Sequence, residues 1–519
     1  MKRKKLLLCF AAIALFAALI FLLTAAERAS EEANIRTVPL ALWYSITTLT
    51  TVGYGDLYPV TAVGRIIGAV LELLSLGALA FLIGALITLL RGKLIPLARI
   101  RRSARKEWFV FPVMTDEAAS LARALYAEDR SRVILFCASE DNAHADMDLP
   151  PYIPSPIGPV GLTKRKKDGR ISVFCMYPDF RENDRLAEAL KAERCIVYCM
   201  TEHEPEDIPE HLHCFDPYDC CARLYWRRFP LLRPDETVVI IGDGKYAEAI
   251  LACALEQNVL SDNMHTVYRA FGNFENFRRN HYRLSEFVSL DKPDACRDSL
   301  FLTDRAWNAQ PDLLLCASRI ILCSDDPDQT IERLNELQRY FPIACPVHVK
   351  YAQPLDGVCT FGCSEEIFTP ELVMRRELNK TAVLLNEIYN RSAGGRAKDW
   401  NALGSFKRRS NIASAEHLRI KVRILLGEDA LRGDEPLTGE LCKKAYAAYA
   451  SADEAQLDRF RRIEHARWMR FHYMNNWSYA KVRNDAARQH PLLVPYDSLC
   501  PADQQKDSYS WELMKQLSE

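Results

Sequence analysis

The sequence predicts a multi-domain membrane protein: an all-α part with two spans and a re-entrant helix, then two α/β units, then a small all-α domain. Three observations predict this order. Two long apolar stretches lie near the start of the 519-residue chain. Short apolar strands alternate with helices from residue 108 onward, and beyond residue 396 the pattern is helical.

Two stretches are long enough to cross a bilayer, which takes about 20 residues. Residues 6–26 carry no charge, and residues 66–90 carry only Glu72. Basic residues precede the first stretch at 2–5 and follow the second at 91–106, which favours a cytoplasmic position for both. A cleaved signal peptide is the alternative for the first stretch. We predict a multi-pass protein of the inner (plasma) membrane with both termini cytoplasmic.

Between the two stretches, residues 38–49 are apolar but too short to cross, which is typical of a helix that enters and returns. Residues 50–56 follow and read Thr-Thr-Val-Gly-Tyr-Gly-Asp. Non-helical backbone at membrane depth is tolerated only where protein encloses it or where it lines water. A dehydrated potassium ion needs carbonyl oxygens in place of its water shell, and glycine permits the backbone turns that aim them at one axis. The motif therefore predicts a potassium selectivity filter shared by four copies of the chain.

The predicted filter supplies four consecutive carbonyl groups, with one hydroxyl at the inner mouth. The predicted potassium ligands are Thr51, Val52, Gly53 and Tyr54, and Gly55 and Asp56 complete the filter. Gly77 and Gly84 in the second stretch are candidate gating hinges, although close helix packing also uses glycine. Glu72 is predicted to pack behind the filter, because a carboxylate in a span needs protein or water around it.

Residues 6–100 closely resemble the pore of two-helix bacterial potassium channels. The resemblance rests on Trp-Tyr-Ser at 43–45, the filter motif, Leu-Tyr-Pro-Val-Thr at 57–61 and Gly-Arg at 64–65. It implies a homotetrameric channel in membrane lipid, with potassium as the permeant ion. Some relatives carry a carboxylate on the pore helix behind the filter, whereas Thr47 stands at that position here. The resemblance therefore predicts nothing about inactivation of the filter.

Two rounds of strand–helix alternation predict two Rossmann-like α/β units, at residues 106–230 and 231–395. The first has predicted strands at 108–111, 132–137, 172–176 and 195–198, and it lacks a glycine fingerprint. The second begins with a strand at 237–241, then Gly-Asp-Gly-Lys-Tyr-Ala, then a helix at 246–256, which is the context of a dinucleotide fingerprint. Its further strands are predicted at 265–270, 319–323 and 347–351.

The glycine turn of the second unit is the candidate nucleotide site, formed by Gly242, Asp243, Gly244, Lys245 and Ala247. The next predicted strand runs into Phe-Gly at 271–272 and lacks the acidic residue that normally holds a ribose. A scaffold that has lost its nucleotide is therefore the alternative. We find no catalytic acid or base and predict no enzyme activity. Both units resemble the regulator-of-potassium-conductance (TrkA-like) domains that lie below such pores, the second more closely than the first.

The last predicted domain, residues 396–519, has amphipathic stretches at 412–426 and 455–473. Glu-His-Ala-Arg-Trp at 464–468, Asn-Trp-Ser-Tyr at 476–479 and His-Pro-Leu-Leu-Val-Pro-Tyr at 490–496 resemble the ryanodine-receptor repeat domain. Its aromatic rings and arginine forks form either a pocket for a nucleotide-type ligand or the core of a small domain. The candidate pocket residues are Arg408, Arg409, Arg467, Trp468, Trp477, Tyr479, His490 and Tyr496.

Three functions follow as hypotheses. The leading one is a homotetrameric potassium channel gated by a small-molecule or nucleotide ligand on its cytoplasmic domains. The second is a signalling effector whose pore is opened by a nucleotide-type messenger through the C-terminal domain. The third is a membrane-anchored NAD-dependent oxidoreductase that uses Gly242 and Gly244. The formal net charge of -1 gives no basic field that would favour nucleic acid as a partner.

Overall fold

A computed structural model describes the fold of residues 2–50, 52–137, 148–166, 168–392, 398–431, 433 and 435–518; side chains are described from residue 14, except 75–79, 81, 82 and 392. The chain forms two compact units, Met1–Ser103 and Ala104–Glu519. The second unit holds both predicted sheets and the C-terminal helices, and each unit is described by itself.

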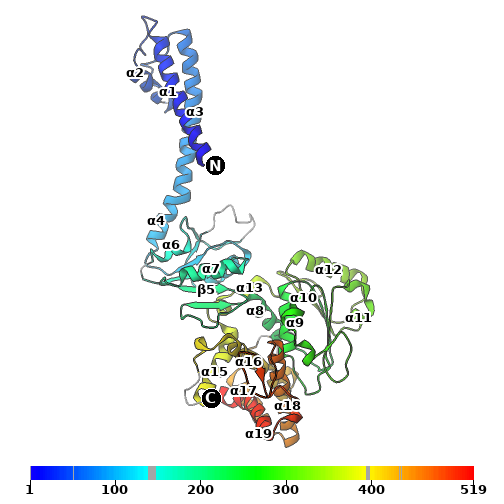
Figure 1. The fold of residues 1–519 in the computed structure, drawn as a ribbon. Coiled ribbons are helices and arrows are strands. Elements are labelled where there is room, and N and C mark those ends of the chain that lie inside the picture. The colour runs from blue at the N-terminus through cyan, green and yellow to red at the C-terminus, as the bar shows by residue number, and fades with distance from the viewer. Residues whose placement is uncertain are drawn as a thin grey trace. The chain divides into compact units, whose positions relative to one another are not determined.

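The first unit is helical: α1 spans Lys2–Glu27, α2 Val38–Leu49, α3 Ala62–Leu89 and α4 Ile95–Arg102, with a π-helical turn at Leu90–Leu94. The short α2 packs against α1 and α3 (Figure 1). The first turn of α2 contains a proline, and α3 begins after Thr61, whose hydroxyl accepts a hydrogen bond from Gly64 N at 2.9 Å. The predicted spans 6–26 and 66–90 fall on α1 and α3. Among the described residues, no helix combines the length and apolarity that a membrane crossing requires.

The first sheet of the second unit has six parallel strands in the order β3-β2-β1-β4-β5-β6, the strand order of a doubly wound Rossmann-type unit. The strands are β1 Trp108–Phe111, β2 Val133–Phe136, β3 Ile153–Pro154, β4 Ile171–Cys175, β5 Ile196–Met200 and β6 Leu212–Phe215. The accompanying helices are α5 Asp116–Glu128, α6 Pro159–Thr163, α7 Phe180–Leu190 and α8 Pro217–Arg228. Aromatic rings of neighbouring strands stack across the sheet, with Phe111 and Phe174 centroids 4.7 Å apart and Phe174 and Tyr198 centroids 4.9 Å apart.

The second sheet has seven parallel strands in the order β13-β12-β11-β7-β8-β10-β9. The strands are β7 Thr237–Ile241, β8 Val267–Phe271, β9 Ser289–Leu290, β10 Ser299–Thr303, β11 Arg319–Leu322, β12 Val347–Lys350 and β13 Cys359–Phe361. Helices α9 Lys245–Gln257 and α10 Glu275–Asn280 lie on one side of it, and α11 Pro311–Leu315 and α12 Pro327–Tyr340 on the other (Figure 1). Side chains of β7 alternate between the two cores, with Val238 and Ile240 on the α9 side and Val239 and Ile241 on the α12 side.

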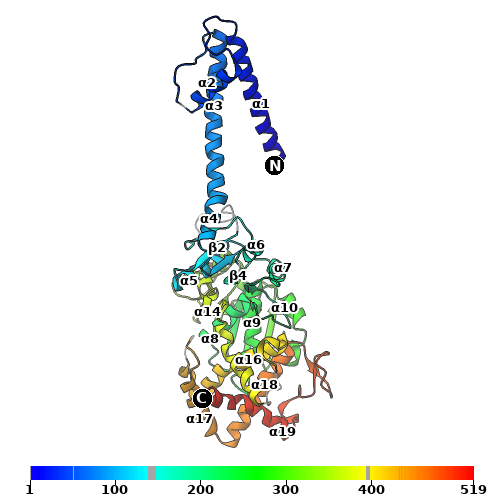
Figure 2. The ribbon, with the colours of Figure 1, turned by 90° about the vertical axis from the view of Figure 1, so that its left-hand side faces the viewer.

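The C-terminal helices form one cluster around buried Trp511, Leu418 and Ile463. They are α15 Lys380–Ser392, α16 Ser405–Leu426, α17 Gly439–Ala450, α18 Glu454–Met474, α19 Pro501–Gln504 and α20 Tyr509–Leu517, with a small sheet of β14 Ser478–Tyr479 and β15 Gln489–His490. Figure 2 shows α16 to α19 at the same end of the unit as the C-terminus. Helices α16 and α18 both contact α9, so this cluster shares an interface with the second sheet.

Candidate functional site

The predicted filter is a loop between α2 and α3. Thr51 lies outside the described residues; the loop is described from Val52 onward. Gly53 and Gly55 have φ angles of 52° and 73°, the left-handed region that side-chain-bearing residues rarely adopt. The amides of Val52 and Gly53 donate to the Thr47 carbonyl at 3.0 and 3.2 Å. The end of α2 therefore holds the start of the loop, and glycine is required at the two positions where the backbone adopts left-handed φ angles.

Aromatic residues of α2 support the loop from the side. The ring of Tyr54 stacks on Trp43, with centroids 6.2 Å apart and planes within 2° of parallel. The Tyr44 hydroxyl donates to Glu72 Oε1 at 2.9 Å. Glu72, which was predicted to pack behind the filter, thus contacts α2, and the bond gives this carboxylate in α3 a polar partner.

Asp56 is anchored through its backbone. Its carbonyl accepts from Asn34 Nδ2 at 2.9 Å, and Asn34 Oδ1 accepts from Tyr58 N at 3.3 Å. The Thr47 hydroxyl donates to the Tyr44 carbonyl at 3.0 Å. Sequence reasoning missed Asn34, because a single asparagine in a polar loop carries no signal of its contacts.

Glu27 is a second anchor that sequence reasoning missed. Its buried carboxylate, at the end of α1, accepts from Val60 N at 3.0 Å, Thr61 N at 3.0 Å and Thr61 Oγ1 at 2.7 Å. These bonds tie α1 to the segment that joins the filter to α3, so they fix the height of the loop relative to both long helices.

We expect Glu27→Gln to loosen this junction. An amide removes the charge from three hydrogen bonds, each worth about 1.5–3 kcal/mol when one partner is charged, and it turns one acceptor oxygen into a donor that faces a backbone N–H. In thermal unfolding of the purified proteins, the first unit should unfold at a lower midpoint temperature in Glu27→Gln than in the unaltered protein. The matched control is Glu32→Gln, whose side chain is exposed. Equal midpoints for both variants would contradict the anchoring role.

The candidate hinges remain predictions. Gly84 lies in α3, with open space where a Cβ would stand. The backbone at Gly77 is described, but the side-chain surroundings of that residue are not. The backbone of α3 is α-helical through both positions and changes to a π-helical turn only at Leu90–Leu94, which contains Gly92. A π-helical turn is a frequent place for a helix to adjust, so Gly92 joins the candidates.

The glycine turn of the second α/β unit is occupied by a carboxylate of the chain itself. Asp325, which follows β11, accepts from Lys245 N at 3.0 Å and from Tyr246 N at 3.1 Å. These amides begin α9, where a nucleotide phosphate would bind in a working site. Gly244 has φ 97°, and a Cβ there would overlap the Asp325 carboxylate. The predicted phosphate position is therefore filled.

The other candidate residues of this turn also have partners within the chain. Lys245 Nζ pairs with Glu202 at 3.1 Å, and Asp243 pairs with Arg333 at 2.6 Å. Gly242 lies against the Cys323 carbonyl so closely that a Cβ would overlap it, and Ala247 is buried in the core. The strand order reverses between β7 and β11, which is where such folds bind ligands. At this point the turn after β7, with Gly242 and Gly244, contacts the turn after β11, with Cys323 and Asp325.

We expect Asp325→Ala to expose the first turn of α9. Loss of a capping carboxylate costs about 0.5–2 kcal/mol, so amide hydrogen exchange at Lys245 and Tyr246 should accelerate several-fold in a peptide-resolved measurement. Asp304→Ala, an exposed carboxylate, should leave that exchange unchanged. A structure of the unaltered protein with a nucleotide phosphate at this turn and Asp325 displaced would contradict the capping role.

Most of the predicted C-terminal pocket residues are structural. Arg408 is fully buried and donates to Glu204 at 2.7 Å and to the backbone carbonyls of Leu403, Pro205 and Glu206. Arg467 is buried beside Glu464 at 2.6 Å. The ring of Trp468 contacts His472 and His490, and the Tyr496 hydroxyl donates to Asp458. Tyr479 is exposed and does not line the cavity described next.

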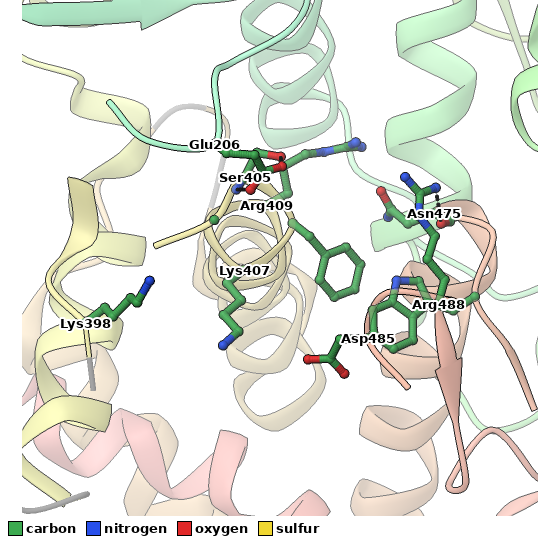
Figure 3. A pocket seen from close by; sticks show the side chains of 11 residues that line it. Glu206, Lys398, Ser405, Lys407, Arg409, Asn475, Asp485 and Arg488 are labelled. Atoms are coloured by element: carbon green, nitrogen blue, oxygen red, sulfur yellow. Dashed lines mark hydrogen bonds between the residues drawn. The ribbon is translucent and has the colours of Figure 1, made fainter. Parts of the chain in front are cut away.

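Arg409 and Trp477 are the two candidates that line a cavity, whose volume is about 430 Å³ (Figure 3). Its wall comes from three parts of the second unit: the loop after β5, which contributes Glu206; the start of α16 with the preceding Lys398; and residues 475–488. Phe406 and Trp477 stack at 4.8 Å, so the wall includes an apolar face. The cavity is thus shifted from the predicted pocket toward the first α/β unit.

Comparison with known proteins assigns two segments. Residues 8–92 match the ion channel family model, and residues 451–518 match the RyR domain model, a shorter segment than the predicted 396–519. The potassium voltage-gated channel protein Shal of Drosophila melanogaster is 44% identical over 62 residues, 12% of this chain and 10% of that protein. The voltage-gated potassium channel of Aeropyrum pernix is 43% identical over 58 residues, 11% of this chain and 20% of that protein. The chain thus spans a fifth or less of these relatives.

Solved structures that align with this chain include the GsuK channel. Its structure has a TM-score of 0.33 and 14% identity, and the alignment covers 72% of this chain and 98% of that one. The GsuK channel bound to NAD gives a TM-score of 0.34 and 12% identity, with 75% and 86% covered. Scores at this level carry no inference about this chain. Residues 8–92 are thus similar to an ion channel domain and to segments of potassium channels, and residues 451–518 are similar to a RyR domain.

Proposed function

We propose that the chain is a subunit of a homotetrameric, potassium-selective channel, gated by a ligand that binds its cytoplasmic part. The observation that carries this proposal is the filter backbone, where Gly53 and Gly55 adopt left-handed φ angles within the segment that matches an ion channel family model. Potassium is the permeant ion. The proposed location is the inner membrane, with two passes and both termini in the cytoplasm.

Exposure of the filter side chains supports assembly around an axis. In the single chain Val52 is 54% exposed and Tyr54 67% exposed, although both are apolar or aromatic. The described outer faces of the three long or re-entrant helices also expose large apolar side chains, among them Phe21, Trp43, Ile66 and Leu73. Apolar surface of this extent calls for lipid or other subunits, because water-exposed patches are rarely so large.

Ion flux into liposomes tests the proposal. Purified protein reconstituted in vesicles should conduct potassium and exclude sodium, and native mass spectrometry of the same sample should give four chains. Equal fluxes of the two ions, or a stable assembly without conduction under any tested metabolite, would refute the proposal.

A signalling effector is the second candidate, in which a nucleotide-type messenger opens the pore through the C-terminal domain. The observation in its favour is the cavity bounded by Phe406, Trp477 and Arg409, part of whose wall belongs to the segment that matches the RyR domain. Calorimetric titration of the full chain with nucleotides separates it from the leading proposal: saturable binding that changes flux supports it, and no heat removes its main support.

An oxidoreductase role has less support. A dinucleotide at Gly242 and Gly244 would need the first amides of α9, and Asp325 accepts hydrogen bonds from them. The proposed function assigns no catalysis to the chain.

A further inference from the structure

The cavity beside α16 carries more positive than negative charge. Four cationic side chains line it, Lys398, Lys407, Arg409 and Arg488, against two carboxylates, Glu206 and Asp485. Figure 3 shows Lys398 and Lys407 opposite Asp485 and Arg488 across the open space. Asp485 is already paired with Arg483 at 2.7 Å, outside the cavity wall. Within the described residues, Lys398 and Lys407 make no ion pair, so their charge is available to a ligand.

Glu206 already places an anion at this wall. Its carboxylate accepts from Ser405 N at 3.0 Å and from Ser405 Oγ at 3.0 Å. The loop that carries Glu206 is held in place by the neighbouring Glu204, which pairs with buried Arg408 at 2.7 Å. A ligand anion that enters the cavity meets the same two donors of Ser405, and it therefore competes with Glu206 for them.

We propose that this cavity binds a small organic anion with at least two negative charges and a planar ring, the chemistry of a nucleoside phosphate. The charges would lie near Lys398, Lys407 and Arg488, and the ring against the face formed by Phe406 and Trp477. Binding would weaken the hold of Glu206 on the start of α16, so occupancy would be communicated to the loop after β5. The proposal deepens the proposed function by giving its ligand a site and a chemical class, and it rests on that function only for the effect on conduction.

The loop after β5 also contacts the start of α9, so ligand binding at Glu206 can affect a second part of the unit. Glu202, Glu204 and Glu206 alternate along it. Glu202 pairs with Lys245 at the start of α9, whereas Glu204 and Glu206 bind Arg408 and Ser405 in the first turn of α16. The loop follows β5 of the first sheet. A change at Glu206 would therefore reach both α/β units. A ligand can shift the protein between two conformations only if it binds one of them more tightly, and this loop is a segment whose position could differ between them.

Binding to the full-length protein in detergent tests the site without any ion flux. ADP, inorganic pyrophosphate and adenosine serve as probes in calorimetric titrations. ADP should bind saturably, pyrophosphate more weakly because it lacks the ring, and adenosine not measurably because it lacks the charge. Lys407→Glu should weaken ADP binding at least tenfold, whereas Lys443→Glu, an exposed lysine on α17, should not change it.

Glu206→Gln gives the sharpest test, because its expected effect has the opposite sign. Removal of the competing carboxylate charge should strengthen ADP binding about tenfold, which a merely structural role of Glu206 would not do. The proposal is overturned if neither ADP nor pyrophosphate binds, if adenosine binds as well as ADP, or if Lys407→Glu binds ADP like the unaltered protein. Binding in a protein that does not conduct potassium would uphold the site and refute the channel.

Discussion

We expect alanine at Gly53 or Gly55 to abolish the proposed potassium conduction while the second unit keeps its fold. Both glycines have φ angles in the left-handed region, at 52° and 73°, where a Cβ costs about 1–2 kcal/mol per residue. In the proposed tetramer, four subunits around one axis would multiply that cost within a single ring of the filter. The backbone relieves it by turning, and a turned carbonyl no longer replaces the water shell of the ion.

Liposome flux and circular dichroism together measure this outcome. Each glycine variant should lose potassium flux without a change in helix content, since among the described residues of the single chain no atom beyond the two flanking residues lies within 4 Å of the added Cβ. Gly158→Ala is the matched control, because Gly158 lies outside the first unit, has an ordinary φ of -67° and has an open Cβ position. Flux at the unaltered level in either filter variant would contradict the assigned role of these glycines.

Glutamine at Glu416 should destabilise the second unit by about 3–5 kcal/mol. Glu416 lies in α16 with a 3% exposed side chain, and it accepts hydrogen bonds from Arg223 at 2.7 and 2.9 Å and from Arg227 at 2.6 and 2.8 Å. Both arginines belong to α8, so this carboxylate joins the first α/β unit to the C-terminal helices. An amide keeps the shape but removes the carboxylate charge that faces Arg227, and it leaves buried Arg223 with only the Asp219 carboxylate at 3.3 Å.

The same carboxylate predicts how stability depends on pH. Burial alone would raise the pKa of Glu416, but the guanidinium groups of Arg227 and Arg223 more than offset it and lower the pKa from 4.5 to about 2. A lowered pKa means that the folded state favours the charged form. Its contribution is therefore complete above about pH 4.5 and is lost as the pH falls toward 2.

Thermal unfolding of the purified protein measures both effects. The unaltered protein should lose stability between pH 4.5 and 2 more steeply than Glu416→Gln, which starts lower and lacks this titration. Glu440→Gln is the matched control, because its side chain is 77% exposed and its pair with Lys444 lies on the surface. An unchanged midpoint in Glu416→Gln at neutral pH would contradict the role of this ion pair.

The sequence predicted the elements that have a strong local signal. The strands at 108–111 and 237–241 have the predicted bounds, because each is a continuous apolar run, as buried parallel strands require. The strands β3, β6, β9, β10 and β13 were missed. Most of them are short or lie at a sheet edge, where pairing rather than composition decides the structure.

Contacts between distant residues explain what sequence reasoning missed at the sites. Asp325 accepts a hydrogen bond from Lys245 N in the glycine turn, 80 residues away along the chain. No local sequence pattern predicts this contact. Arg408 was predicted to hold a ligand but is held by Glu204 across 204 residues. Arg467 is different: Glu464 stands three residues before it on one helix face, and that spacing could have identified the pair. The filter could be predicted without knowledge of its distant contacts, because the backbone angles themselves require glycine at these positions.

The most direct test of the central claim is the reversal potential of single channels in a planar bilayer with potassium on one side and sodium on the other. Purified protein should give currents that reverse far toward the potassium equilibrium potential, and Gly55→Ala protein prepared in the same way should give none. Currents that reverse near zero, or that persist unchanged in the variant, would contradict a potassium-selective pore built on Val52–Asp56.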